Sequence, residues 1–183
     1  LASSDKTTIH KLRLLAGQQQ LLRLDIEQTF DWKEWRSTKK SFSKKLKDFG
    51  AVIVSDYGKG TLQDVPFIIQ QAKKRDIPVF IDPKGNNFNK YKGAYIITPN
   101  YLEFSTEVGG VKNEQELNGK ASNMIKKLSL QGLLITRGQE GMTLFKKERG
   151  KVNRSDFPTE ARDVFDVSGA GDTVIASLAA AQS

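Results

Sequence analysis

The chain has 183 residues, a length that fits one domain with a buried core. Cysteine is absent and His10 is the single histidine, which excludes disulfides and thiolate metal sites and disfavours histidine-based triads. The net charge of +8 raises the question of nucleic-acid or phosphate partners. Since no apolar run approaches the ~18 residues of a membrane span and the first residues lack a signal-peptide pattern, we expect a soluble cytoplasmic protein with no membrane partner.

Two segments near the amino terminus alternate apolar and charged residues. In "KLRLL" (11–15) Leu12 and Leu14 alternate with Lys11 and Arg13, and the pattern returns in "LLRLDIE" (21–27). Strict alternation is typical of strands buried on one face. The pattern therefore predicts an antiparallel hairpin, joined through "AGQQQ" (16–20), with one face in water.

The stretch from Trp32 to Asp48 carries much of the positive charge. Its apolar residues recur at spacings of three, four and seven, which predicts an amphipathic helix with its lysines outside. These apolar residues are Trp32, Trp35, Phe42, Leu46 and Phe49. A solvated helix face explains the charge, and we favour it over a nucleic-acid patch, so no nucleic-acid partner is expected.

Four short apolar runs follow Gly50 and have the nearly continuous apolar composition that is typical of central strands buried on both faces. They are "AVIVSD" (51–56), "IPVFIDP" (77–83), "AYIITPN" (94–100) and "GLLITRG" (132–138). Segments 62–75 and 113–130 have helical patterns, whereas 83–93 is rich in Gly and Asn and favours a loop. Strands that alternate with helices predict an α/β domain with a mainly parallel sheet flanked by helices.

Each of these four runs ends in polar residues, and the carboxyl ends of parallel strands meet at one edge where ligands bind. The polar ends are Asp56, Asp82, Asn100, and Thr136 with Arg137. The loops "DYGKG" (56–60) and "DPKG" (82–85) add Lys59 and Lys84. We expect Asp56, Lys59, Asp82 and Lys84 to contact phosphate or substrate, although lysines are also common in ordinary loops.

The segment "DVFDVSGAGDTVIASLAAA" (163–181) places small residues and one acid between a strand-like and a helix-like run. Gly169, Ala170 and Gly171 should fall at the first helical turn, where free N–H groups form an anion hole. Asp172 could then accept the proton of an attacking hydroxyl during phosphoryl transfer. The alternative, that Asp172 only complements the helix dipole, has equal weight from the residues alone.

Two further motifs leave alternatives open. Asn100 and Glu103 could organise Mg²⁺ through oxygen, but the same pair forms a capping box, which we favour. Gly138 and Gly141 bracket a hairpin turn, whereas Thr136 and Arg137 beside it could contact nucleotide phosphates.

In this order, "N-x-x-E", "T-R-G-x-x-G" and "D-V-S-G-A-G-D" resemble the ribokinase-like (PfkB) family of carbohydrate kinases. The resemblance implies a ribokinase-like fold, ATP and Mg²⁺ as cofactors, and Asp172 as catalytic base. It also implies that Gly169, Ala170 and Gly171 form the anion hole and that Asn100 and Glu103 organise the metal. The residues expected near the nucleotide are Thr136, Arg137, Gly138 and Gly141.

Within that family, "HKLRLLAGQQQLLRLD", "VIVSDYGKGTL", "IDPKG" and "ITPNYLEF" are similar to kinases of heptose 7-phosphate. This implies phosphorylation of D-glycero-β-D-manno-heptose 7-phosphate at its anomeric hydroxyl, in ADP-heptose and lipopolysaccharide core synthesis. Residues 1–30 would be a lid hairpin and 31–183 the α/β core of a partial, inactive kinase domain. An amino-terminal part and a carboxyl-terminal nucleotidyltransferase domain would lie outside this chain.

Two other functions stay open from the sequence. One is a PfkB kinase of a different sugar phosphate, and the other is a nucleotide-binding module without turnover. A homodimer is a further expectation.

Overall fold

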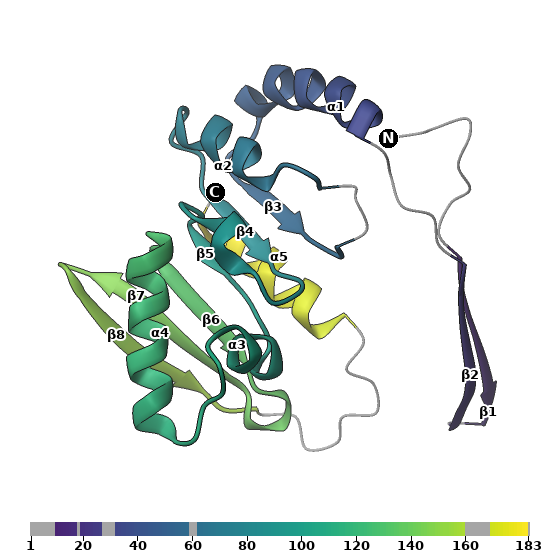
Figure 1. Cartoon of the computed structure of the whole chain (residues 1–183), viewed down its shortest axis with the longest axis vertical. Coiled ribbons are helices and arrows are strands. Elements are labelled where there is room, and N and C mark those ends of the chain that lie inside the picture. The colour runs from purple at the N-terminus through teal and green to yellow at the C-terminus, as the bar shows by residue number, and fades with distance from the viewer. Residues whose placement is uncertain (1–9, 18, 27–31, 59–61, 160–168, 183) are drawn as a thin grey trace.

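A computed structural model of the chain describes residues 10–17, 19–26, 32–58, 62–159 and 169–182 (Figure 1). They form a two-stranded sheet and a six-stranded sheet. The small sheet is the predicted antiparallel hairpin of β1 (His10–Ala16) and β2 (Gln19–Ile26). Lys59 and the strand-like run at 163–167 lie outside the described residues.

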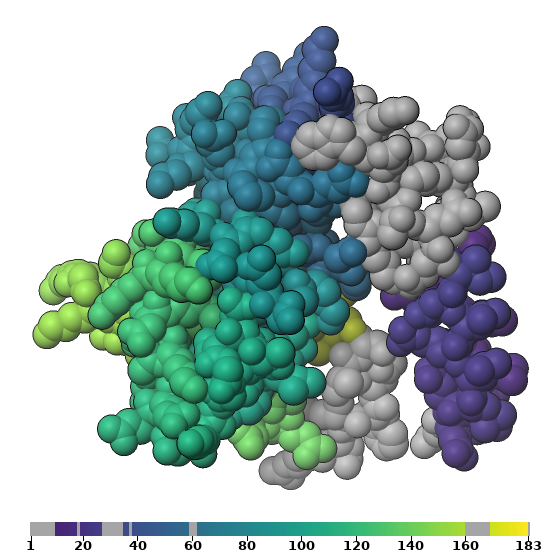
Figure 2. Space-filling view, viewed as in Figure 1, coloured from purple at the N-terminus to yellow at the C-terminus, as the bar shows by residue number. Residues whose placement is uncertain are grey.

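The register of the hairpin separates an apolar face from a charged one. Leu12 lies opposite Leu24 and Leu14 opposite Leu22, while Arg13 lies opposite Arg23 on the other face. The prediction that these strands are half-buried is wrong, since the four leucines are exposed. A two-stranded sheet has no second layer to cover its apolar face. Figure 2 shows the hairpin at one side of the molecule and the ends of β7 and β8 projecting at the other.

The large sheet has the order β3-β4-β5-β6-β7-β8. Its strands are β3 (Val52–Ser55), β4 (Val79–Asp82), β5 (Ile96–Ile97), β6 (Gly132–Thr136), β7 (Met142–Glu148) and β8 (Lys151–Phe157). The first four run parallel, as predicted, and β7 and β8 add an antiparallel meander. The sequence did not reveal β8, because its only apolar residues, Val152 and Phe157, do not alternate.

The helices include the two predicted crossovers at 62–75 and 113–130. They are α1 (Trp32–Lys45), α2 (Val65–Lys73), α3 (Tyr101–Glu107), α4 (Glu114–Leu128) and α5 (Ala170–Gln182), with short 3-10 turns η1 (Leu46–Asp48), η2 (Phe88–Tyr91) and η3 (Gly138–Glu140). Trp35 and Leu46 are buried and Lys40, Lys44 and Lys47 are exposed, which confirms the amphipathic helix. Phe49 departs from the prediction and is exposed, because its backbone turns extended after η1 and leaves the helical face.

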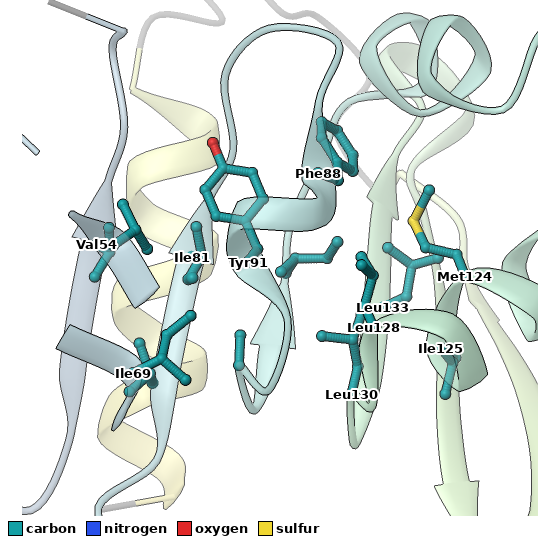
Figure 3. Packing of buried hydrophobic residues seen from close by; sticks show 14 of the residues in the cluster. Val54, Ile69, Ile81, Phe88, Tyr91, Met124, Ile125, Leu128, Leu130 and Leu133 are labelled. Carbon is teal, nitrogen blue, oxygen red and sulfur yellow. The ribbon is translucent and has the colours of Figure 1, made fainter. Parts of the chain in front are cut away.

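Alternation along the strands divides the core between the two faces of the sheet. Ile81 and Leu133 lie in the larger cluster with α1, α2, α4 and η2 (Figure 3). Phe80 and Leu134, one position away, lie in a smaller cluster under Ile175 of α5. Figure 1 shows α5 behind the sheet near β4 and β5. Among the described residues, no helix combines the length and apolar character needed to cross a membrane.

Candidate active site

The polar ends of the parallel strands meet at one edge of the sheet, as predicted. The Asp56 N–H donates to the Asp82 carbonyl at 3.0 Å, which joins the ends of β3 and β4. Asn100 pairs with Thr136 in a parallel bridge, and the Thr136 N–H donates to the Pro99 carbonyl at 3.1 Å. Residues far apart in sequence therefore converge where α/β folds place ligands.

Asp56 is buried and its carboxylate is surrounded by donors. The Gly58 N–H donates to Oδ1 at 2.8 Å, while Lys90 Nζ at 2.6 Å and the Tyr91 hydroxyl at 2.9 Å donate to Oδ2. Burial alone would raise the pKa of Asp56, but the hydrogen bond from Lys90 and those from Gly58 and Tyr91 outweigh it and lower the pKa. Asp56 is therefore an ionised group whose oxygens are already occupied.

Asp82 has the opposite environment. Burial raises the pKa of its carboxyl to about 6, and the negative charges of Glu103 and Asp172 add to the effect. Lys84 partly offsets this rise. Glu103 and Asp172 therefore each lie close enough to Asp82 to affect its carboxyl, although the sequence separates Asp82 from Asp172 by most of the α/β core. We call Asp82, Glu103 and Asp172 the acidic cluster.

Lys84 faces the acidic cluster through Glu103. Its Nζ donates to Glu103 Oε1 at 2.8 Å, and this hydrogen bond is the largest cause of a raised pKa at Lys84. Glu103 Oε2 accepts from the Asn100 N–H at 3.1 Å, and Asn100 Oδ1 accepts from the Glu103 N–H at 2.8 Å. The capping box favoured from the sequence is thus present at the start of α3.

The start of α5 lies beside this cluster. The helix begins at Ala170, as predicted, directly after Gly169, whose φ of 81° is a conformation that glycine adopts without strain. Gly171 and Asp172 complete its first turn, and all of these residues are exposed. The first N–H groups of a helix have no intrahelical acceptor, so this turn can receive an anion next to the Asp172 carboxylate.

The loop after β6 is a tight hairpin turn. The Arg137 N–H donates to the Gly141 carbonyl at 2.8 Å, and the Gly141 N–H donates to the Gly138 carbonyl at 3.1 Å. At Gly141, with a φ of 87°, an added Cβ would lie 2.0 Å from the Phe157 carbonyl oxygen, so only glycine fits. The hairpin-turn interpretation is confirmed.

Arg137 itself is held by carboxylates rather than left open. Its Nη2 pairs with Glu114 at 2.8 Å and with Glu140 at 2.7 Å, and its guanidinium lies 5.8 Å from the Tyr101 ring centroid. A phosphate would therefore compete with two acids for this side chain. Thr136 remains half-buried at the sheet edge beside Asn100.

Sequence reasoning missed Lys90 and Tyr91 of η2. Both reach Asp56 from more than thirty positions downstream, out of a segment interpreted as a loop. A tyrosine followed by Lys-Gly in a Gly/Asn-rich link carries no periodic pattern, so no signal pointed to them. Among the described residues, Tyr91 is nevertheless the largest side chain that is fully buried.

A cavity of about 530 Å³ lies at the other end of the sheet, where the strands begin. Residues that precede strands line it, including Pro78, Tyr95 and Gln131, together with Gln182 of α5. It shares no residue with the acidic cluster. Within the described residues, no group of three or more His, Cys, Asp or Glu side chains is arranged to hold a metal ion alone.

The family pattern of pfkB carbohydrate kinases matches residues 10–183. The chain belongs to this family. It is 47% identical over 174 residues to the bifunctional protein HldE of Haemophilus influenzae, covering 95% of this chain and 36% of that protein. With HldE of Aeromonas hydrophila the identity is 46% over 176 residues, again covering 36% of the relative. The chain thus spans about a third of the length of these curated relatives.

Solved structures show the same fold. Phosphofructokinase-2 from Escherichia coli, in complex with substrates and products, superposes with a TM-score of 0.69 at 15% identity, covering 94% of this chain and 58% of that chain. Ribokinase from Arabidopsis thaliana, complexed with ribose and ATP, gives a TM-score of 0.65 at 19% identity, covering 88% and 54%. The ribokinase-like α/β fold expected from the motifs is therefore confirmed.

Proposed function

We propose that the protein containing this chain transfers the γ-phosphoryl group of ATP to a hydroxyl of a phosphorylated sugar. The observation that carries the proposal is the acidic cluster, in which Glu103 and Asp172 lie near Asp82 at the start of α5 and Lys84 pairs with Glu103. Phosphoryl transfer needs a base, donors for the moving phosphoryl group and compensation of its charge. These elements lie at one sheet edge, in a chain of the pfkB family.

Asp172 is the proposed base. Its carboxylate would accept the proton of the sugar hydroxyl while the hydroxyl oxygen forms a bond to the γ-phosphorus and the bond to the β-phosphate oxygen breaks, releasing ADP. The N–H groups of Gly169, Ala170 and Gly171 would hold the phosphoryl oxygens. Lys84, which is exposed and pairs with Glu103, would neutralise part of the phosphate charge.

The cofactors would be ATP and Mg²⁺. A divalent cation would fit the acidic cluster, because carboxylate oxygens are ligands that Mg²⁺ prefers and Lys84 only partly offsets the negative charges near Asp82. Mg²⁺ is typically held by one or two carboxylates and the substrate phosphates, with waters completing the set, so a full protein cage is unnecessary. Glu103 and Asn100 would organise the ion, which would supply charge compensation for the phosphates.

The nucleotide would lie along the turn after β6, near Thr136, Arg137, Gly138 and Gly141. The tight backbone of this turn supports the proposal, since Gly141 packs so closely on the Phe157 carbonyl that no side chain fits there. Arg137 would reach phosphate only by leaving Glu114 or Glu140. Asp56 and Asp82 would shape the sugar side of the site, and Lys59 would add a cation from the same loop as Asp56.

The substrate we propose is D-glycero-β-D-manno-heptose 7-phosphate, phosphorylated at the anomeric hydroxyl for ADP-heptose and lipopolysaccharide core synthesis. Similarity to heptose 7-phosphate kinases along the sequence and 46–48% identity to HldE support it. The chain would be part of a kinase domain, inactive alone, with 1–30 as lid and 31–183 as core. A nucleotidyltransferase domain in the same protein would explain the name bifunctional. We propose the cytoplasm as the location of the reaction, because ATP is available there.

A homodimer is the proposed assembly, with the apolar hairpin face as its contact. Leu12, Leu14, Leu22 and Leu24 line that face and are all 49–63% exposed. A contiguous apolar face of this kind is typical of an interaction site. One protein with a similar solved structure, phosphofructokinase-2 from Escherichia coli, is described as tetrameric in its inhibited form.

The full-length protein should be assayed with Mg²⁺, ATP and a panel of sugar phosphates. We expect ADP release with heptose 7-phosphate and much less with hexose phosphates. Equal turnover of another sugar phosphate would favour a different pfkB kinase. ATP binding without turnover of any sugar would instead identify a nucleotide-binding module.

A further inference from the structure

The buried Asp56 carboxylate connects three segments that have no sequence proximity. They are the loop after β3, the loop after β4 and the η2 turn. Tyr91 is the link, because its hydroxyl donates to Asp56 Oδ2 at 2.9 Å and accepts from the Lys84 N–H at 3.0 Å. Figure 3 shows the Tyr91 ring at the rim of the core cluster, with its hydroxyl pointing away from Ile69 and Leu130.

The direction of the Tyr91 hydrogen bond follows from its surroundings. The hydroxyl has one proton and two acceptors within reach, Asp56 Oδ2 at 2.9 Å and the Lys84 carbonyl at 3.3 Å. The ionised carboxylate is both nearer and the stronger acceptor. Burial raises the pKa of Tyr91 well above its usual range, so the hydroxyl keeps this proton. The lone pairs of the oxygen then remain available to the Lys84 N–H.

Asp56 is not positioned to bind substrate directly. Its side chain is 5% exposed, and the donors from Gly58, Lys90 and Tyr91 occupy both of its oxygens. Releasing these partners inside the protein would leave a buried charge unpaired, which is costly. Asp56 is therefore suited to be a fixed anchor, whereas Asp172 is exposed and can reach a ligand.

The fixed anchor ends at the residue that faces the acidic cluster. The Lys84 backbone is tied to Tyr91, while the Lys84 side chain is 55% exposed and reaches Glu103 at 2.8 Å. We propose that Tyr91, anchored by Asp56, is a positioning residue that sets where the Lys84 ammonium stands in the phosphoryl-transfer site. This inference rests on the proposed kinase function. A displaced lysine would weaken charge compensation in the transition state more than it weakens ATP binding.

The test uses the full-length protein and five variants, one of which, Lys84→Met alone, is the reference for the double variant. Tyr91→Phe keeps the buried ring and removes only the hydroxyl. Tyr95→Phe is the matched control, because its ring packs on Phe80 in the smaller cluster, with ring centroids 5.5 Å apart. Lys90→Met removes the other donor to Asp56 Oδ2 but leaves the Lys84 N–H its acceptor. The double variant Tyr91→Phe/Lys84→Met shows whether the loss of the Tyr91 hydroxyl acts through the Lys84 ammonium or through a disturbance elsewhere in the protein.

Amide hydrogen exchange at Lys84 gives a readout that does not depend on catalysis. We expect Tyr91→Phe to speed this exchange about five- to tenfold, the factor for one lost hydrogen bond. Lys90→Met and Tyr95→Phe should leave it within about twofold of the parent. Unchanged exchange in Tyr91→Phe would overturn the inference.

Kinetics give the second readout. Tyr91→Phe should lower kcat about tenfold with a change in the KM for ATP below about threefold, and Tyr95→Phe should behave as the parent. The double variant should be no slower than Lys84→Met alone, because both changes act through one ammonium group. Losses that multiply in the double variant would refute the positioning role while leaving the kinase function intact. Absence of phosphoryl transfer in the unsubstituted protein would refute the proposed function and the inference together.

Discussion

Two aspartates at neighbouring strand ends have pKa values that are shifted in opposite directions. Asp56 follows β3 and Asp82 ends β4, and a 3.0 Å backbone hydrogen bond joins them. Burial acts on both, yet the pKa of Asp56 is lowered and that of Asp82 is raised to about 6. Asp56 has three donors around it, whereas Asp82 has carboxylates for neighbours. Position at the sheet edge therefore brings acids together, and local partners decide which becomes an anchor and which belongs to a site.

Substitution of Asp56, the anchor, should lower the stability of the protein. Asp56→Asn removes the charged acceptor of Lys90 and Tyr91 and leaves an amide that cannot satisfy every donor. We expect the free energy of unfolding to fall by about 2 to 3 kcal/mol. Denaturant unfolding measures this difference. A loss below about 0.5 kcal/mol would mean that the donors around Asp56 contribute little.

Asp82→Asn should have the opposite sign. The substitution removes a charge that the fold destabilises by burial and by repulsion from Glu103 and Asp172. Since Asp82 is only partly buried, screening reduces the effect, and we expect a gain of about 1 kcal/mol near pH 7. The same unfolding experiment decides it. If both substitutions destabilise equally, the contrast between the two strand ends is wrong.

The smallest expected effect is the pH dependence of the stability that Asp82→Asn gains over the parent. A carboxyl whose pKa is raised to about 6 binds more protons in the native state than in the unfolded state between about pH 4 and 6. The free energy of unfolding of the parent therefore falls, relative to Asp82→Asn, as the pH rises through this window. Unfolding curves at intervals across the window should show the gap close toward pH 4. A constant gap would contradict the assignment.

Much of the fold could be predicted because buried strands and amphipathic helices have strong periodic signals. The parallel order of the strands and the shared edge of Asp56, Asp82, Asn100 and Thr136 followed from short apolar runs with polar ends. The exposed leucines of the hairpin could not be foreseen in the same way. Alternation shows that Leu12 and Leu24 share a face, but it does not show whether another layer covers that face.

The partners of the site residues were less accessible to sequence reasoning. Asp56 depends on Lys90 and Tyr91, and Arg137 depends on Glu114, twenty-three positions upstream. Side-chain contacts over such distances follow from packing in three dimensions, which no local pattern encodes. The capping box of Asn100 and Glu103 was predictable because its partners lie within one helical turn.

The proposed role of Asp172 as the base of phosphoryl transfer is tested most directly by measuring kcat, ATP affinity and melting temperature for Asp172→Asn in the full-length protein. Asparagine keeps the size of the side chain but cannot take a proton, so we expect kcat to fall by about 10² to 10⁴ with ATP affinity and melting temperature close to the parent. A variant that melts earlier yet turns over near the parental rate would show that Asp172 serves only the start of α5.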